Sequence, residues 1–335
     1  MSLRLVEVFL SIVQTDQFKM LLKDHSVLGV WYHQIDNDCV SVRFLAKSED
    51  LEPFLDALES RFSISVEFRV ILLPVEAVIP RLKEPEPEQP EVKPVDEKPR
   101  VFRINREELR HDLVESAHLT STFVSMVILS AIVAAVGLLR GNPAIIIGAM
   151  VIAPLLGPNM ALSLAFTLAD SDLARQAIRV SIAGTLLALF FAVIVGMALS
   201  VDPLSPEIAS RTEVGLGDIL LALASGAAGA ISLTAGVPSA FVGVMVAVAL
   251  LPPLVTCGMM IGAGYLPHAA RAFLLLLTNV ICVNLAAITT FRIRGIQPRT
   301  WWEADRARKA SRMAIGIWVL LLLGLVALIL VWQKL

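Results

Sequence analysis

The sequence predicts an α-helical integral membrane domain of about seven spans with two inverted three-helix repeats, preceded by a soluble α+β ferredoxin-like domain. Three observations predict this fold class: an apolar composition, seven long apolar runs and an internal repeat. Apolar residues make up 56% of the 335-residue chain and charged residues 17%, against about 45–50% and about 25% in an ordinary soluble protein. This composition is typical of a protein embedded in a membrane.

The charges are divided unequally along the chain. Residues 1–115 hold 15 Lys and Arg and 22 Asp and Glu, whereas residues 116–335 hold 13 and 8. The first part therefore carries a net charge of −7 and the second +5, and neither has the basic surface that binding duplex nucleic acid requires. Three cysteines, an odd number, do not form a disulfide scaffold. We expect an acidic soluble part, a membrane part and no nucleic-acid partner.

The soluble part alternates between strand-like and helical patterns. Its six elements, in the order strand, helix, strand, strand, helix and strand, cover residues 3–10, 15–24, 27–35, 39–46, 48–62 and 63–73. This order predicts a cytoplasmic ferredoxin-like domain over residues 1–80. The sequence of this domain contains no phosphate loop, metal cluster or catalytic pair, so an assembly or regulatory role is favoured over an enzymatic one.

Residues 81–100 are predicted to be a linker. Five prolines alternate there with six acidic and five basic residues, and such a composition does not form a packed core. We expect an extended tether between the soluble domain and a transmembrane domain over residues 101–335.

Seven stretches are long and apolar enough to cross about 30 Å of hydrocarbon. They cover residues 119–139, 143–169, 177–201, 219–237, 238–266, 272–291 and 313–332. The loop over residues 292–312 is rich in arginine, whereas the loop after the third span is acidic. Because short basic loops stay in the cytoplasm, the N-terminal domain is predicted to lie in the cytoplasm and the C-terminus outside the inner (cytoplasmic) membrane. The basic loop is also a candidate contact for anionic lipid, although topology signalling alone explains its charge.

The membrane part contains an internal repeat. A shift of 95 residues places residues 143–158 on 238–253 with seven of sixteen positions identical, where shared apolar composition gives roughly two. Repeat one covers about 119–201 and repeat two about 219–291, and the span at 313–332 lies outside the repeat. Three spans per unit insert the second unit upside down relative to the first, an architecture common among secondary transporters.

The middle span of each unit contains prolines that predict a broken helix. Pro154, Gly157 and Pro158 lie near the centre of the first, and Pro252 and Pro253 occupy the same region of the second. Backbone released from a helix inside a bilayer must be buried in protein or line a wet cavity, so paired breaks indicate a transport site. Two structural kinks are the alternative explanation.

Uncharged polar residues lie near these breaks. They are Asn159, Ser163 and Thr167 in the first unit and Thr256, Cys257, Asn279 and Asn284 in the second. Asn159, Thr256, Asn279 and Asn284 join the five break residues as candidate substrate-binding residues. Asn279 and Asn284 are five residues apart and need not share a helix face, and hydrogen bonds between helices explain such amides equally well. Gly258 and Gly262 are expected to pack helices together.

The sequence predicts no enzyme, no metal site and no cofactor. Residues 215–218 read Gly-Leu-Gly-Asp, which resembles the signature of intramembrane aspartyl proteases. That chemistry needs two carboxylates close together, and no predicted span carries an acidic residue at mid-depth. Asp218 is predicted instead to cap the start of a helix.

Residues 142–158, which contain Gly-Ala-Met-Val-Ile-Ala-Pro-Leu-Leu-Gly-Pro, resemble the bacterial membrane family catalogued as domain of unknown function 389. Residues 51–59 and 249–253 are similar to that family as well, so the resemblance covers nearly the whole chain. Asn159 departs from the family pattern, in which an apolar residue follows the Gly-Pro. The resemblance implies a multi-pass membrane protein of unestablished activity and carries over no substrate, cofactor or catalytic residue.

Together these patterns predict a transporter or channel for a small solute, with its site at paired broken helices near the bilayer midplane. The lack of a carboxylate or histidine at mid-membrane depth argues against an autonomous proton-coupled pump. Half-helix N-termini and backbone carbonyls are expected to bind a neutral or anionic solute. The alternative is a membrane-anchored sensor or scaffold, whose soluble domain binds an effector and whose spans oligomerise. We expect the protein to form a homo-oligomer.

Overall fold

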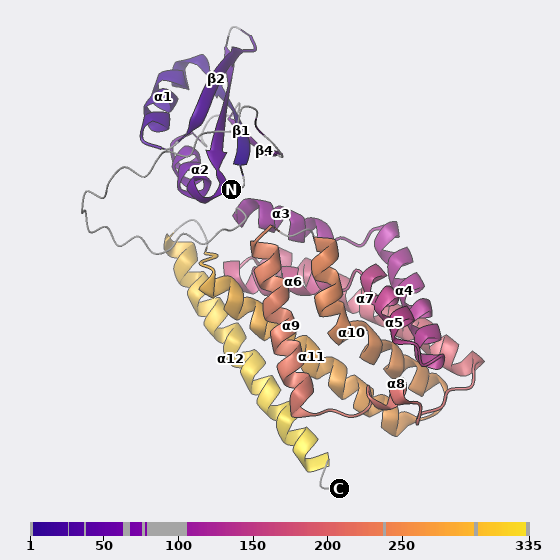
Figure 1. Ribbon diagram of the computed structural model, residues 1–335. Helices are drawn as coiled ribbons and strands as arrows, with labels where there is room; N and C mark the ends of the chain where they lie inside the picture. Colours follow the sequence, from indigo (N-terminus) through magenta and orange to yellow (C-terminus); the bar gives the residue numbers. More distant parts are fainter. Residues whose placement is uncertain are drawn as a thin grey trace, which may run out of the picture. The chain divides into compact units, whose positions relative to one another are not determined.

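A computed structural model describes residues 3–25, 27–36, 38–62, 68–75, 78, 106–236, 239–297 and 301–332. The chain divides into two compact units, Met1–Arg106 and Glu107–Leu335 (Figure 1). The predicted linker over residues 81–100 lies outside the described residues.

The N-terminal unit is a small antiparallel sheet with two helices. In chain order its elements are β1 (Leu3–Ser11), the short 3-10 helix η1 (Ile12–Gln14), α1 (Thr15–Lys23), β2 (Leu28–Gln34), β3 (Cys39–Lys47), α2 (Ser48–Phe62) and β4 (Arg69–Val75). The strand order is β2-β3-β1-β4, and every neighbouring pair is antiparallel. The last strand begins at Arg69, and residues 63–67 of the predicted extended run lie outside the described residues.

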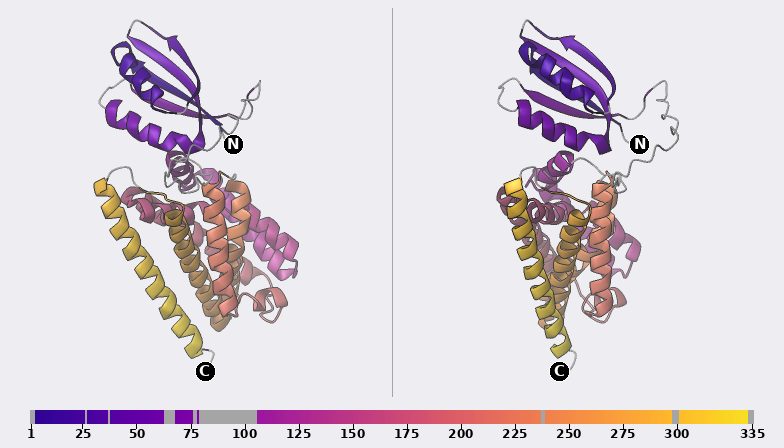
Figure 2. Two further views of the ribbon diagram at one scale, coloured as in Figure 1. Left: turned by 60° about the vertical axis from the view of Figure 1, so that its left-hand side comes forward. Right: turned by 90° about the vertical axis from the view of Figure 1, so that its left-hand side faces the viewer.

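The core of this unit lies between the sheet and the two helices (Figure 2). Val6, Val8 and Leu10 of β1 are fully buried while their neighbours are half-exposed, as the two-residue period of a strand requires. Phe18 of α1 packs against Phe54 of α2 with ring centroids 6.2 Å apart. The alternating strand pattern and the apolar helix faces therefore meet in one core.

The C-terminal unit is built from helices. They are α3 (Arg106–Ser116), α4 (Ser121–Leu139), α5 (Pro143–Ile152), α6 (Leu156–Leu168), α7 (Ser171–Ala198), α8 (Pro206–Ala209), α9 (Leu216–Thr234), α10 (Ser239–Gly262), α11 (Leu266–Ile293) and α12 (Trp301–Trp332). Helix α12 lies at the edge of the bundle against α6 and α11 (Figure 2).

Among the described residues, five helices are long and apolar enough to cross a membrane: α4, α7, α9, α11 and the Ala307–Ala327 part of α12. Counting the pair α5 and α6 as one bent span gives six. The described apolar part of α10, Ala249–Gly262, is shorter than a span. The chain therefore has the helices of a multi-pass membrane protein, and the count of seven spans stays a prediction.

Glycines bring α7 and α10 into close contact. A Cβ atom added to Gly196 of α7 would fall on the backbone of Met259 in α10. A Cβ atom on Gly262 would meet the backbone of Val193, and one on Gly258 would lie 2.9 Å from the carbonyl oxygen of Leu189. Gly258 and Gly262 therefore pack helices together, as predicted.

Asp218 supports the start of α9, although not as the capping residue itself. Gly215 is the N-cap, and Asp218 is the third residue of the helix. The Asp218 carboxylate accepts a hydrogen bond from the Gly215 amide at 2.9 Å. The side chain thus satisfies an amide at the positive end of the helix.

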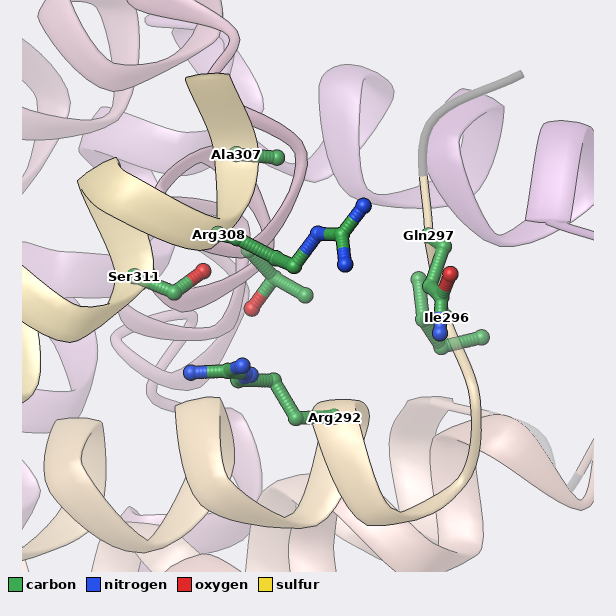
Figure 3. Close-up of a pocket in the computed structure, with 7 residues that line it drawn as sticks. Arg292, Ile296, Gln297, Ala307, Arg308 and Ser311 are labelled. Atoms are coloured by element: carbon green, nitrogen blue, oxygen red, sulfur yellow. The ribbon is translucent and has the colours of Figure 1, made fainter. Parts of the chain in front are cut away.

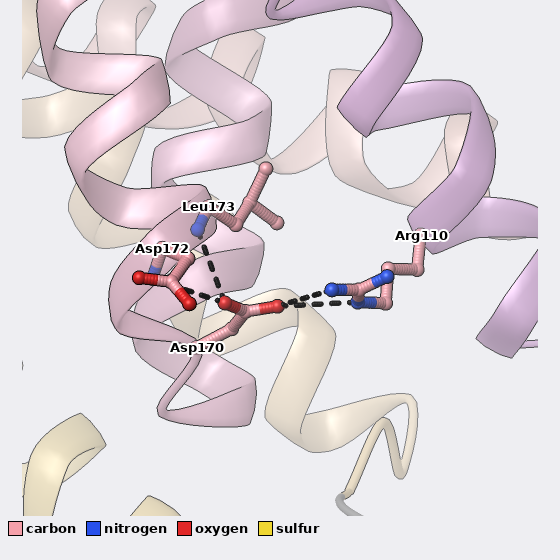
Figure 4. Close-up of polar contacts among 4 residues, drawn as sticks. All are labelled: Arg110, Asp170, Asp172 and Leu173. Atoms are coloured by element: carbon pink, nitrogen blue, oxygen red, sulfur yellow. Dashed lines mark hydrogen bonds and ion pairs between the residues drawn. The ribbon is translucent and has the colours of Figure 1, made fainter.

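Arg110 and Asp170 join α3 to the start of α7 (Figure 4). Asp170 caps α7 by accepting from the amide of Leu173 at 3.0 Å, and Arg110 Nη2 donates to its other carboxylate oxygen at 2.7 Å. Burial by itself raises the pKa of Asp170, but the Leu173 amide and the Arg110 guanidinium outweigh burial and hold the pKa below its ordinary value. The charged form of Asp170 therefore stabilises this junction.

We expect Asp170→Asn to flatten the acid dependence of stability. A lowered folded-state pKa means that the carboxylate stabilises the fold above the unfolded pKa of about 3.9, and this contribution is lost as pH falls through the folded value. Asparagine still caps a helix, so Asp170→Ala is expected to cost about 1 kcal/mol more. Thermal melting of the detergent-solubilised protein between about pH 3 and about pH 7, a range that includes the unfolded pKa, measures the acid dependence and the effect of Asp170→Ala. Parallel pH profiles for wild type and Asp170→Asn would contradict the assignment.

Candidate functional site

The first middle span is broken between α5 and α6, as predicted. Helix α5 ends at Ile152, Ala153 is extended (φ −67°, ψ 118°), and the two helices are bent by 54°. A proline disfavours the helical conformation in the residue before it, so Pro154 explains the extended backbone of Ala153. Pro158 is the third residue of α6, where the amide has no partner within the helix and proline removes no hydrogen bond.

Pro252 and Pro253 do not break α10, and the prediction of a second break is wrong. Both prolines lie inside the continuous helix. Pro253 has no amide hydrogen for the carbonyl of Ala249, and Asn279 Nδ2 of α11 donates to that carbonyl at 2.7 Å instead. Ala249 also takes the place that Pro154 has in the first repeat, so the second unit lacks the proline that opens the first.

Asn284 of α11 contacts α6 one turn after the break. Asn284 Nδ2 lies 3.2 Å from Asn159 Oδ1, and Ser163 Oγ lies 2.9 Å from Asn284 Oδ1. Asn284 Nδ2 is also 2.8 Å from the carbonyl of Val280. All three polar side chains are buried, and buried amides need such partners because water does not reach them. The structure thus brings Asn159 and Asn284 together.

Asn159, Ser163 and Thr167 form a buried polar stripe along α6. Their four-residue spacing puts them on one face of the helix, and each is at least nine-tenths buried. Ser163 Oγ is 3.1 Å from the Asn159 carbonyl, and Thr167 Oγ1 donates to the Ser163 carbonyl at 2.8 Å. The polar stripe covers about 12 Å of the helix, from Asn159 to Thr167.

Among the described residues, no hydrogen bond joins Asn279 or Thr256 to the polar stripe, and Gly157 is a packing residue. Asn279 Oδ1 and Thr256 Oγ1 are buried without a hydrogen-bond partner among the described residues. A Cβ atom on Gly157 would lie 2.6 Å from the Ser116 side chain, so this glycine lets α3 approach α6. Of the nine candidate residues, Asn159 and Asn284 are joined by a hydrogen bond. The described residues hold no group of three or more His, Cys, Asp or Glu placed to bind a metal ion.

A cavity of about 180 Å³ lies at the end of the polar stripe away from the break (Figure 3). The lining residues come from α6, α11, the turn after α11, and α12: Thr167, Arg292, Ile296, Gln297, Ala307, Arg308 and Ser311. Sequence reasoning assigned Arg292 and Arg308 to a basic loop and missed the cavity. The only sequence signal was the basic loop itself, because the contact of α12 with α6 is not readable from either segment alone.

Comparison with known proteins finds a family model and a similar protein, and neither description names an activity. The family model described as Domain of unknown function (DUF389) matches residues 150–285, a range that contains all nine candidate residues. The chain is 36% identical over 301 residues to "Uncharacterized protein MJ0678" of Methanocaldococcus jannaschii, which covers 90% of this chain and 91% of that protein. No solved structure matches the chain.

Proposed function

The chain belongs to the DUF389 family, and we propose that it moves a small neutral or anionic solute through its helical domain, with the site at the break between α5 and α6. The observation that carries this proposal is the buried polar stripe that begins at the break. Interrupted backbone inside a bilayer is tolerated where protein buries it or where water reaches it. A break followed by buried amides and hydroxyls therefore supports a solute path better than a plain kink.

The packing of the helices supports two related three-helix units. Helix α4 contacts α7 in the first unit as α9 contacts α11 in the second. Helix α10, the middle helix of the second unit, contacts α7, the last helix of the first unit. In the same way α6, from the middle span of the first unit, contacts α11, the last helix of the second unit. Such reciprocal contacts are expected of two units related by a pseudo-two-fold axis. We propose that these units are the inverted repeats, an arrangement found in many secondary transporters.

Four further features belong to this proposal. We propose that α10 completes a seventh span, and that the basic loop over residues 292–312 keeps the N-terminal unit in the cytoplasm and the C-terminus outside the inner membrane. The strand order β2-β3-β1-β4 supports a ferredoxin-like domain that regulates or assembles the protein. We also propose a homo-oligomer.

Solute flux in liposomes that contain the full-length protein tests the proposal. Chloride followed by an entrapped halide-sensitive dye is the anionic probe, and glycerol followed by light scattering is the neutral one. Wild-type protein is expected to raise the flux of one probe above that of protein-free liposomes. Folded protein that moves neither probe would favour the membrane-anchored sensor or scaffold.

Pro154→Ala and Asn159→Leu are expected to lower this flux sharply. Replacing Pro154 favours helix across the break by about 3 kcal/mol, and Asn159→Leu removes a polar group at similar volume. Asn284 keeps its contact with the Val280 carbonyl in that variant, so the fold should survive. Pro143→Ala is the matched control, because Pro143 is the first residue of α5, where proline is tolerated. Wild-type flux in folded Pro154→Ala and Asn159→Leu, as in the Pro143→Ala control, would show that the break is only a structural kink.

A further inference from the structure

We infer that α3 controls the break between α5 and α6: docked α3 keeps the broken span closed, and displaced α3 lets the break open. The role of this control in solute movement rests on the proposed function, whereas the contacts of α3 with α6 and α7 are a property of the helical unit. The N-terminal unit ends at Arg106, the first residue of α3. A change in that unit therefore reaches α3 through the chain itself.

The end of α3 lies against the first turn of α6. A Cβ atom added to Gly157 would lie 2.6 Å from the Cβ and 2.7 Å from the Oγ of Ser116, the last residue of α3. Gly157 is four residues after Ala153, the extended residue at the break, and two residues before Asn159 of the polar stripe. Helix α3 thus contacts the broken span at the point where the second half begins.

Two polar contacts fix α3 to the start of α7. Arg110 Nη2 donates to Asp170 Oδ2 at 2.7 Å (Figure 4), and Asp170 is the second residue after the end of α6. Gln176 Nε2 of α7 donates at 3.0 Å to the carbonyl of Ala117, which directly follows α3. Helix α3 therefore reaches both ends of α6, and the angle between α5 and α6 is fixed as long as α3 is docked.

The polar stripe is closed in this docked arrangement. Asn159, Ser163 and Thr167 are each at least nine-tenths buried, so a solute has no open access to them. Movement along the stripe then requires that an element beside the break be displaced. Ser116 covers Gly157 at that point, so α3 is placed to act as the cover.

Helix α3 is also the element that is displaced most readily. Six of its eleven residues are charged, and its buried apolar side chains are Leu109 and Leu113. The side chains of Arg110 and Asp170 are 44% and 18% exposed, and ion pairs that water reaches contribute little net stability. The spans α7 and α10, by contrast, meet backbone against backbone at their glycines.

Two variants of the full-length protein release α3 in different ways. Gly157→Ala places a Cβ atom against Ser116, and Arg110→Gln/Gln176→Leu removes both polar contacts with the start of α7 while α6 is unchanged. Gly157→Ala/Ser116→Gly is the expected suppressor. It removes the two Ser116 side-chain atoms and leaves the Ser116 carbonyl oxygen at 3.3 Å, a contact that a shift of a few tenths of an ångström relieves.

Two further variants are matched controls. Gly148→Ala makes the same substitution in the other half of the broken span, where an added Cβ atom would meet no atom of the described residues within 4 Å. Arg175→Gln removes a charge on α7 next to Gln176. The Arg175 side chain is 71% exposed and pairs with Asp172, so this change leaves the contacts of α3 intact.

Hydrogen–deuterium exchange read by mass spectrometry in detergent follows the break without any assay of transport. Both release variants are expected to exchange at least about tenfold faster in α3 and over residues 150–163, because exchange reports the free energy of local opening. The suppressor and both controls are expected to exchange as wild type does. The release variants should also raise the flux in liposomes of whichever probe wild-type protein moves.

Unchanged exchange over residues 150–163 in Arg110→Gln/Gln176→Leu would overturn the control of the break by α3. A rise spread over all helices, or a Gly157→Ala effect that Ser116→Gly does not reverse, would do the same. Arg110→Gln/Gln176→Leu decides the matter if Gly157→Ala does not fold. The expected exchange pattern without flux of either probe in any variant would support control of the break by α3 and contradict the proposed transport.

Discussion

Replacing Asn279 with leucine is expected to destabilise the membrane domain by about 1–3 kcal/mol, because the carbonyl of Ala249 then loses its donor. In the wild type Asn279 Nδ2 donates to this carbonyl at 2.7 Å, and Pro253 has no amide hydrogen to offer it. The loss occurs among buried apolar residues, where water does not replace the missing bond.

Pro253→Ala should suppress this defect. It restores an amide at position 253, which donates to the Ala249 carbonyl within α10. The two substitutions are therefore expected to couple by about 1–3 kcal/mol in a double-mutant cycle, measured by denaturant unfolding in mixed micelles. Asn279→Leu also removes Asn279 Oδ1, which has no hydrogen-bond partner among the described residues, and the cycle cancels this contribution to stability because it is the same in both backgrounds.

Thr278→Val is the control for the Asn279 cycle. The Thr278 hydroxyl donates to the carbonyl of Leu274 in its own helix at 2.9 Å, so its loss should add independently to Pro253→Ala. An Asn279→Leu effect of the same size with and without Pro253 would show that the amide does not replace the missing backbone donor.

Gly196→Ala is expected to destabilise the protein by more than about 3 kcal/mol. Its added Cβ atom would fall on the backbone of Met259, and backbone atoms of a packed helix have no rotamer by which to move away. Helices α7 and α10 would have to separate. Because the clash begins at Cβ, a larger residue such as leucine is expected to act in the same direction.

Gly148→Ala is the matched control for the α7–α10 contact. Gly148 also lies inside an apolar helix, and a Cβ atom there would meet no atom of the described residues within 4 Å. Alanine is favoured over glycine in a helix by about 0.5–1 kcal/mol, so this variant should be neutral or slightly more stable. Thermal melting and gel filtration in detergent measure both variants. Equal melting temperatures for Gly196→Ala and wild type would contradict the close contact.

The amino-acid sequence alone predicts the elements whose cause lies within a few residues. The strands of the N-terminal unit follow from side chains that alternate in and out of a core. The break after α5 follows from Pro154, which acts on the backbone of the residue before it. The four-residue spacing of Asn159, Ser163 and Thr167 likewise defines one helix face, whichever helices pack against it.

Tertiary packing determines which residues of other helices become the partners of these groups. The same local rule that predicts the break at Pro154 fails at Pro252 and Pro253, because Asn279, 30 positions beyond Ala249, donates to the Ala249 carbonyl. Asn284 meets the polar stripe, and Arg292 and Arg308 share a cavity, through the packing of separate helices. Backbone sterics act between neighbours in sequence, whereas the partner of a buried polar group depends on which helices pack together.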